Sequence, residues 1–151
     1  MNVGEICNRV VVVTRRETPL PAAAALMREH HVGSLVVVED GARGRVPVGI
    51  LTDRDIVVAV VAPGVDPRVV TVGEMMTGDL LTLREQDSVY DALRLMRGRG
   101  IRRVPVVTPA GTLAGIVTLD DLLETVAEQL NGIVRAIASE QAREKRVRKP
   151  S

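Results

Sequence analysis

Val48-Gly49-Ile50-Leu51-Thr52-Asp53-Arg54-Asp55-Ile56 is the stretch that decides the fold, because it returns as Ala114-Gly115-Ile116-Val117-Thr118-Leu119-Asp120-Asp121-Leu122. In each copy the apolar residues before the Thr are typical of a buried strand. The Thr-x-x-Asp pattern that follows predicts a helix start, because the Thr oxygen can accept from free helical amides and the Asp suits the positive end of the helix. The sequence therefore predicts, twice, a strand that runs directly into a helix.

The same stretch has a second interpretation, as part of a ligand site. A carboxylate held at a strand end, beside unpaired helical amides, can hold a ribose while the amides and the hydroxyl meet a phosphate. For one copy alone, helix capping is the favoured interpretation. The repetition strengthens the binding interpretation, and both stay open at this point.

The duplication extends beyond this stretch. Val3-Gly4-Glu5 corresponds to Val72-Gly73-Glu74, and Leu26-Met27-Arg28 corresponds to Leu95-Met96-Arg97, at one constant spacing. Each copy reads as strand, helix, strand, strand, helix, so we predict an α/β (α+β) fold of two β-α-β-β-α repeats packed with pseudo-twofold symmetry. Two copies packed together can bury the apolar sheet face that one copy leaves open, and they leave two related clefts lined by both copies.

The repeat also sets the expected boundaries. Residues 1–64 form the first repeat, 65–71 the linker, 72–130 the second repeat and 131–151 a C-terminal helical or basic tail. The opening strands are expected at Val10–Val13 and Leu80–Leu83. The first helix of each repeat is expected to be capped by Thr18, followed by Pro19, and by Ser88.

Composition narrows the class of protein. The chain has 151 residues, of which 46% are hydrophobic, so it is globular. No apolar run reaches the ~20 residues of a membrane helix, and the N-terminus lacks the basic and apolar segments of a secretion signal. The single Cys7 cannot form an internal disulfide, which fits a reducing compartment. We therefore expect a cytoplasmic protein without membrane association.

Charge and aromatic content argue against nucleic acid as a partner. Twenty basic and nineteen acidic residues leave a net charge of +1, and Tyr90 is the only aromatic residue in the whole sequence. A platform for stacking bases needs several rings. A weaker possibility of RNA or DNA binding rests on the basic stretch 142–149 alone.

The C-terminal segment has apolar residues at helical spacing from Leu122 to Ile137, so an amphipathic helix either continues past Asn131-Gly132 or breaks there. A solvated or disordered end is the default expectation for such a tail. The alternative is a dimer or partner contact, because the apolar stripe is longer than the second repeat needs.

Metal binding and catalysis are not indicated. His30-His31, with Cys7, lack the spacing of a completed metal site, and histidines at a helix C-terminus also favour the helix dipole. The serines have no recurring His-acid partners. We expect no metal and no enzymatic activity.

The chain resembles a tandem pair of cystathionine β-synthase-type (CBS) domains. The resemblance covers the sequence from Val3 to about Leu130. It rests on the two Gly-Ile-x-Thr-x-x-Asp signatures, on Met75-Met76-Thr77 opening the second copy, and on Gly100-Ile101-Arg102-Arg103-Val104-Pro105-Val106-Val107.

The resemblance implies a stand-alone regulatory module that binds an adenine nucleotide (AMP, ADP or ATP, with S-adenosylmethionine or NAD as further candidates) and signals to an unknown effector protein, commonly as a homodimer. The Asp of each Thr-x-x-Asp would hold the ribose and the Thr would approach the phosphate. One site would be formed by Ile50, Thr52, Arg54, Asp55, Asp79, Leu80, Arg102, Arg103, Val104 and Pro105. The other would be formed by Ile116, Thr118, Asp121, Asn8, Val10, Gly33, Ser34 and Leu35.

The two implied sites differ in charge. The first has three arginines, whose guanidinium groups suit phosphate oxygens. The second has Gly33-Ser34 in place of two arginines, and Asp120 in place of Arg54, which disfavours a phosphate. We therefore expect the first site to bind nucleotide better than the second. The rival hypothesis is a structural or protein-interaction dimer module whose clefts hold no nucleotide.

Overall fold

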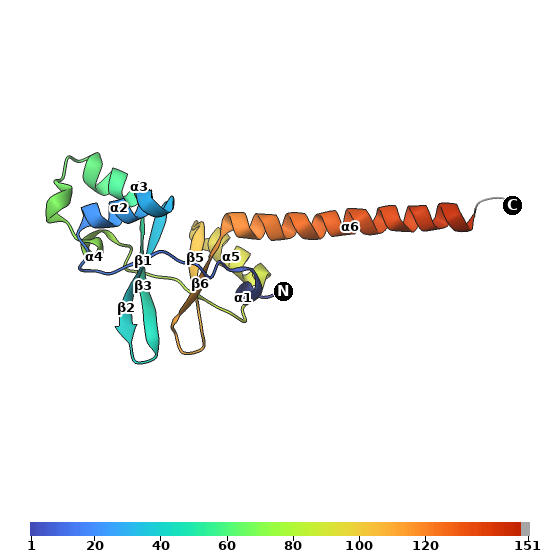
Figure 1. Ribbon diagram of the computed structural model, residues 1–151, viewed down its shortest axis with the longest axis horizontal. Coiled ribbons are helices and arrows are strands. Elements are labelled where there is room, and N and C mark those ends of the chain that lie inside the picture. Colours follow the sequence, from blue (N-terminus) through green and yellow to red (C-terminus); the bar gives the residue numbers. More distant parts are fainter. Residues whose placement is uncertain (149–151) are drawn as a thin grey trace.

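The computed structural model describes residues 1–148 as two sheets with short helices around them and one long C-terminal helix (Figure 1). Lys149 to Ser151, the end of the predicted basic tail, lie outside the described residues. The elements are α1 (Val3–Ile6), β1 (Val13–Thr14), α2 (Leu20–His30), β2 (Ser34–Gly41), β3 (Gly44–Thr52), α3 (Asp53–Ile56), the π-helical turn η1 (Val57–Val61), the 3₁₀ turn η2 (Pro67–Val69), α4 (Val72–Met75), β4 (Leu83–Arg84), α5 (Val89–Arg99), β5 (Arg103–Val107), β6 (Leu113–Thr118) and α6 (Leu119–Val147).

The two sheets have the same topology, which confirms the predicted fold class and its internal repeat. The strand orders are β1-β2-β3 and β4-β5-β6. In each sheet the short first strand is parallel to the second, and the second is antiparallel to the third. The antiparallel pairs β2–β3 and β5–β6 are formed by the two consecutive strands that the sequence predicts in each copy.

The two copies exchange their opening helices. Val3 and Cys7, from the start of the chain, are buried in the same core as Met96 and Val104 of the second sheet's layer. In the same way Val72, from α4, is buried in a core with residues of the first sheet's layer, among them Leu51. The apolar side chains of each opening segment therefore tie the two copies to each other.

Each exchanged segment crosses the third strand of the other copy at the Gly-Ile signature. Asn8 forms an isolated bridge with Ile116, and Thr77 forms one with Ile50. A Cβ at Gly115 would lie 2.7 Å from the Asn8 carbonyl oxygen, and a Cβ at Gly49 would lie 3.1 Å from that of Thr77. These two glycines therefore allow the close approach of backbone from the opposite copy.

Two predictions about local structure were wrong. The opening strands are shorter and later than expected, since β1 and β4 hold two residues each. The helix predicted to start after Thr18 begins at Leu20 instead, with Pro19 in the extended conformation. The cause is a tertiary contact, because Pro19 is bridged to Thr71 and the Leu20 amide donates to the Val70 carbonyl at 2.9 Å.

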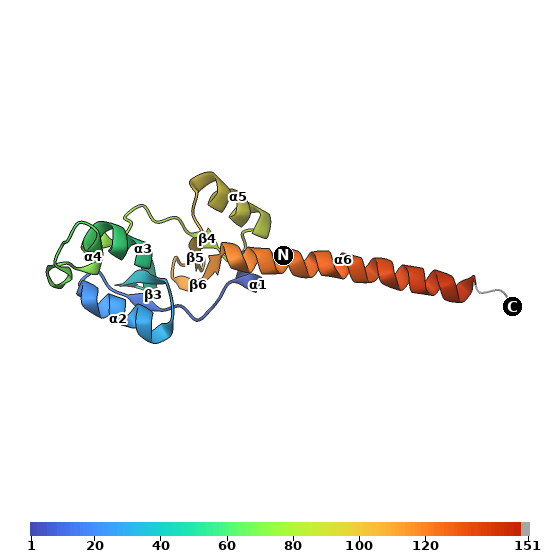
Figure 2. The same cartoon turned by 90° about the horizontal axis from the view of Figure 1, so that it is seen from above.

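The C-terminal helix does not break at Asn131-Gly132. α6 is continuous over 29 residues, and in Figures 1 and 2 it projects from the two sheets in a single direction. From Val126 to Arg148 every described residue is exposed. None of the helices among residues 1–148 combines the length and the apolar character needed to cross a membrane.

Candidate functional site

Both Thr-x-x-Asp stretches form complete capping boxes. Asp55 N donates to Thr52 Oγ1 at 3.1 Å, and Thr52 N donates to the Asp55 carboxylate at 2.9 Å. The Thr118–Asp121 pair shows the same two distances. In each pair one carboxylate oxygen, Oδ2, accepts from the backbone, and the other remains for a further donor.

A cavity of about 360 Å³ opens beside the first capping box, between the two copies. It gathers the end of β3, the loop that follows α4, and the start of β5, so both copies contribute to its wall. Its lining residues are Ile50, Thr52, Asp53, Arg54, Thr77, Asp79, Leu80, Leu81, Gly100, Ile101, Arg102 and Arg103.

Seven of the residues expected at the first site line this cavity: Ile50, Thr52, Arg54, Asp79, Leu80, Arg102 and Arg103. The other three do not. Val104 and Pro105 are buried within β5, and the carboxylate of Asp55 is turned toward the backbone of Thr52 in the capping box. The sequence interpretation also missed five lining residues, whose place in the wall depends on the path of the neighbouring chain: Asp53, Thr77, Leu81, Gly100 and Ile101.

A second, smaller cavity of about 240 Å³ lies beside the second capping box. It is lined by Asn8, Val10, Val11, Val12, Val32, Gly33, Ser34, Val36, Arg103, Ile116 and Thr118. Six of the expected residues are present, whereas Leu35 is fully buried and Asp121 is held in its capping box. The valines of the opening segment make this wall more apolar than expected.

Arg103 lines both cavities, which the sequence did not indicate. Its register explains this position: Arg103 pairs with Thr118 at the first residue of β5, between the two capping boxes. In the first sheet the corresponding pair is Ser34 and Thr52. The pseudo-twofold arrangement therefore places an arginine on one side of the axis and a serine on the other.

The first cavity has an excess of positive charge, with three arginines and two aspartates in its wall. Arg102 lies 3.8 Å from Asp120 across mostly exposed side chains, so water and salt screen this contact. Within residues 1–148, neither Arg54 nor Arg103 forms an ion pair with a carboxylate. Both guanidinium groups are thus available to an anionic ligand.

Gly33 takes the position that Arg102 has in the other copy. Asp53 N donates to the Gly33 carbonyl at 3.0 Å, as Leu119 N donates to that of Arg102 at 2.8 Å. A Cβ at Gly33 would lie 3.1 Å from the Asp53 carboxylate. A side chain at this position would need the Asp53 carboxylate to move by a few tenths of an ångström, and glycine leaves the second cavity without the counterpart of Arg102.

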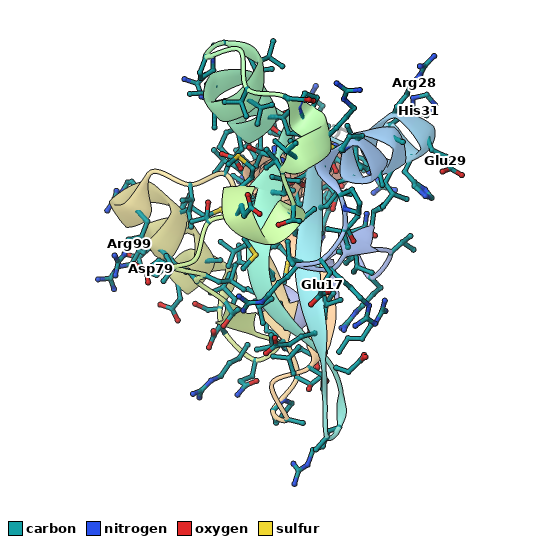
Figure 3. All side chains as sticks on the ribbon, turned by 90° about the vertical axis from the view of Figure 1, so that its left-hand side faces the viewer. Glu17, Arg28, Glu29, His31, Asp79 and Arg99 are labelled. Atoms are coloured by element: carbon teal, nitrogen blue, oxygen red, sulfur yellow. The ribbon has the colours of Figure 1, made fainter. Side chains whose placement is uncertain are left out.

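The remaining candidate residues lie away from the cavities. His30 and His31 are exposed, and Figure 3 shows His31, with Arg28 and Glu29, at the outer end of α2 and away from Asp79. Among the described residues, no cluster of three or more His, Cys, Asp or Glu side chains could hold a metal ion. Cys7 is buried, and burial raises the pKa of its thiol.

Comparison with known proteins matches the chain to one domain family twice, once in each copy of the repeat. The CBS domain family model matches residues 3–62 and 72–128. Hypoxic response protein 1 of Mycobacterium tuberculosis is 38% identical over 143 residues, which is 94% of this chain and 93% of the relative. An uncharacterized protein of Methanopyrus kandleri is also 38% identical, over 82% of this chain, and the chain spans only 62% of that relative's length.

Solved structures share the fold. Hypoxic Response Protein I with two coordinated zinc ions matches with a TM-score of 0.70 and 35% identity, over 82% of this chain and 98% of that one. CBSX2 in complex with AMP matches with a TM-score of 0.73 and 27% identity, over 84% and 97%. A hexameric CBS-CP12 protein from bloom-forming cyanobacteria matches with a TM-score of 0.73 and 29% identity, over 93% and 84%.

Proposed function

Because the chain belongs to the CBS domain family, as a tandem pair of such domains, we propose that it is a regulatory module that binds an adenine nucleotide between its two copies. The observation that carries the proposal is the first cavity, whose lining includes Arg54, Arg102 and Arg103 together with Thr52 at a helix start. Phosphate groups suit such a wall, since guanidinium groups bind them in bidentate geometry. AMP, ADP and ATP are the proposed ligands.

The capping residues have a defined part in this proposal. Thr52 lines the cavity and would approach the phosphate. Asp55 lies behind the wall, with Oδ2 engaged by the Thr52 amide, so its Oδ1 is the oxygen that would accept from a ribose hydroxyl. Gly100 and Ile101, with Leu80 and Leu81, offer the apolar surface and backbone groups that an adenine ring needs.

The first site is proposed to bind more tightly than the second. Arg103 is the one basic residue in the wall of the second cavity, which is also smaller and richer in valine. AMP in complex with CBSX2 shows that a CBS protein of this fold takes such a ligand. That observation concerns CBSX2, and it supports the class of ligand proposed here.

Thermal denaturation in the presence of ligand tests the proposal. AMP, ADP, ATP, S-adenosylmethionine and NAD are each titrated to millimolar concentration, and the melting temperature is followed. A ligand that binds only the folded state raises it. No change with any of the five would overturn the proposal, and inorganic phosphate serves as the control for an effect of the anion alone.

Regulation requires that the ligand bind one arrangement of the copies more tightly than another. A ligand that binds two arrangements equally does not shift the equilibrium between them. The effector is proposed to be another polypeptide. Self-association is supported by apolar side chains exposed on helical surfaces, among them Val57, Val58, Tyr90 and Leu93, and by the hexameric CBS-CP12 structure. A homodimer and a cytoplasmic location stay predictions.

An interaction module without nucleotide is the second candidate, and the exposed apolar side chains of α6 favour it. The two candidates differ in measurable ways. If no nucleotide changes the melting temperature and the oligomeric state depends on α6, the interaction module is the better description. If a nucleotide stabilises the protein, binding in the cavities is supported whatever the oligomeric state.

A further inference from the structure

The exposed face of α6 carries an apolar seam made of Leu119, Leu123, Val126, Leu130, Ile133 and Ile137. Leu119 also packs against the core of its own chain, but from Leu123 onward the seam is open: Leu130 is 60% exposed, Ile133 58% and Ile137 51%. Figures 1 and 2 show this part of the helix standing clear of both sheets. Apolar residues at alternating spacings of three and four are typical of a helix that packs along a second helix.

We propose that this seam pairs with α6 of a second copy of the chain, with the two helices antiparallel. The spacings along the seam are four, three, four, three and four residues, which read the same in both directions. An antiparallel copy can therefore place Leu119 opposite Ile137, Leu123 opposite Ile133, and Val126 opposite Leu130 of its partner. Every seam residue then has an apolar counterpart, which a helix of unrelated sequence would match only by chance.

Charge selects the antiparallel orientation. Between Leu119 and Val134 the helix has four acidic residues and no basic one, whereas five basic and two acidic residues lie between Arg135 and Arg148. Parallel pairing would set the two acidic halves side by side. Antiparallel pairing about Glu128 instead sets the acidic residues 120–128 of one copy beside residues 128–136 of its partner, a stretch whose only charged residues are Glu128 and Arg135.

The residues beside the seam are compatible with close packing. Ala127, Val134, Gln129 and Ala136 flank it, and all four are uncharged. Asp120 flanks the first turn of the seam, whereas the acidic residues Glu124 and Glu128 lie further around the helix and keep the opposite face hydrated. Beyond its first turn the seam is thus a continuous apolar surface with uncharged edges, as a helix–helix interface requires.

The mass of the full-length protein in solution, measured by light scattering, tests whether the seam is used. Leu130→Glu places a charge at the middle of the seam and is expected to halve the mass of the particle. Ser139→Glu, on the opposite face of α6, is the matched control and should leave the mass unchanged. A monomeric wild-type protein at micromolar concentration, or a Leu130→Glu variant of unchanged mass, would overturn the proposal.

Cysteine cross-linking tests the orientation independently of any loss of folding. In a Cys7→Ala background, Val126→Cys mixed with Leu130→Cys should form a disulfide-linked dimer under mild oxidation, because these positions face each other only in the antiparallel register. Each variant alone should cross-link much less. Equal cross-linking of Val126→Cys with itself would show parallel pairing, and no cross-linking in any combination would exclude the pairing of these helices.

Discussion

Asn8 and Ile116 exchange two backbone hydrogen bonds across the two copies. Asn8 N donates to the Ile116 carbonyl at 2.8 Å, and Ile116 N donates to the Asn8 carbonyl at 2.9 Å. The neighbouring Gly115 has no side chain where the Asn8 carbonyl and the Cys7 sulfur approach, and both would lie 2.7 Å from a Cβ there. The docking of α1 on the second sheet therefore depends on this glycine.

Gly115→Ala is expected to destabilise the protein by about 1–3 kcal/mol, as overpacking of a well-packed core does. The free energy of unfolding, measured by chemical denaturation, checks this value. Gly98→Ala is the matched control, because Gly98 lies inside α5 with no atom within 4 Å of an added Cβ. That control should stabilise the helix by about 0.5–1 kcal/mol; a Gly115→Ala variant as stable as wild type would contradict the close approach.

Arg103 provides a test of both cavities at once. Since it lines both, Arg103→Ala is expected to weaken nucleotide binding at each, by about 10- to 100-fold, the usual effect of losing a hydrogen bond to a charged group. Arg102→Ala should weaken the first site alone. Isothermal titration calorimetry with AMP and ATP measures the change, and Arg97→Ala, on exposed α5 surface, is the control. Equal losses in Arg97→Ala and Arg103→Ala would place the binding elsewhere.

The fold could be predicted from the repeat because each copy carries its own local signals. Apolar runs and Thr-x-x-Asp patterns depend on neighbouring residues, and both capping boxes form as the sequence indicates. The start of α2 could not be predicted, because Thr71, from a distant part of the chain, holds Pro19 in an extended bridge. Local preference was overridden there by pairing between the copies.

The region where the cavities lie could be predicted from the sequence, but the full set of lining residues could not. Strand ends gather at the cavities because the sheets are paired as expected, but a side chain's orientation depends on register. Leu35 and Val104 follow the first residues of β2 and β5 and turn into the cores, while Arg103 and Ser34 face the cavities. Whether α6 breaks at Gly132 or continues could not be predicted either, since a glycine in open surroundings costs the helix only about 1 kcal/mol.

Asp55 and Asp121 form a matched pair for comparing the two sites. Their capping contacts have equal lengths, so Asp55→Ala and Asp121→Ala, which each remove one such hydrogen bond, should each cost about 0.5–1.5 kcal/mol of stability. Nucleotide binding is expected to fall further in Asp55→Ala, because the first cavity has the three arginines. Calorimetric titration of both variants decides the ranking. Equal losses of affinity, or a larger loss in Asp121→Ala, would show that the ranking of the sites is wrong.

The thiol of Cys7 offers a measure of how firmly α1 is docked. Burial, the largest influence, raises the pKa of this thiol, and nearby Glu85 adds to the rise while Arg9 opposes it. The folded protein therefore holds the proton at pH values where the unfolded chain releases it. The stabilising contribution of this group is present below about pH 9 and is lost as the pH rises further.

Reaction of Cys7 with a disulfide reagent such as DTNB at pH 8 should accordingly be slower in the native protein than in denaturant by a factor of about 10 or more, because the thiolate is the reactive form and burial also limits access. The Gly115→Ala variant, in which Cys7 and Asn8 must shift, should react faster than wild type, whereas Gly98→Ala should not. If native Cys7 reacted as fast as the unfolded thiol, α1 would not be held on the second sheet, and the exchange of opening helices between the copies would have to be abandoned.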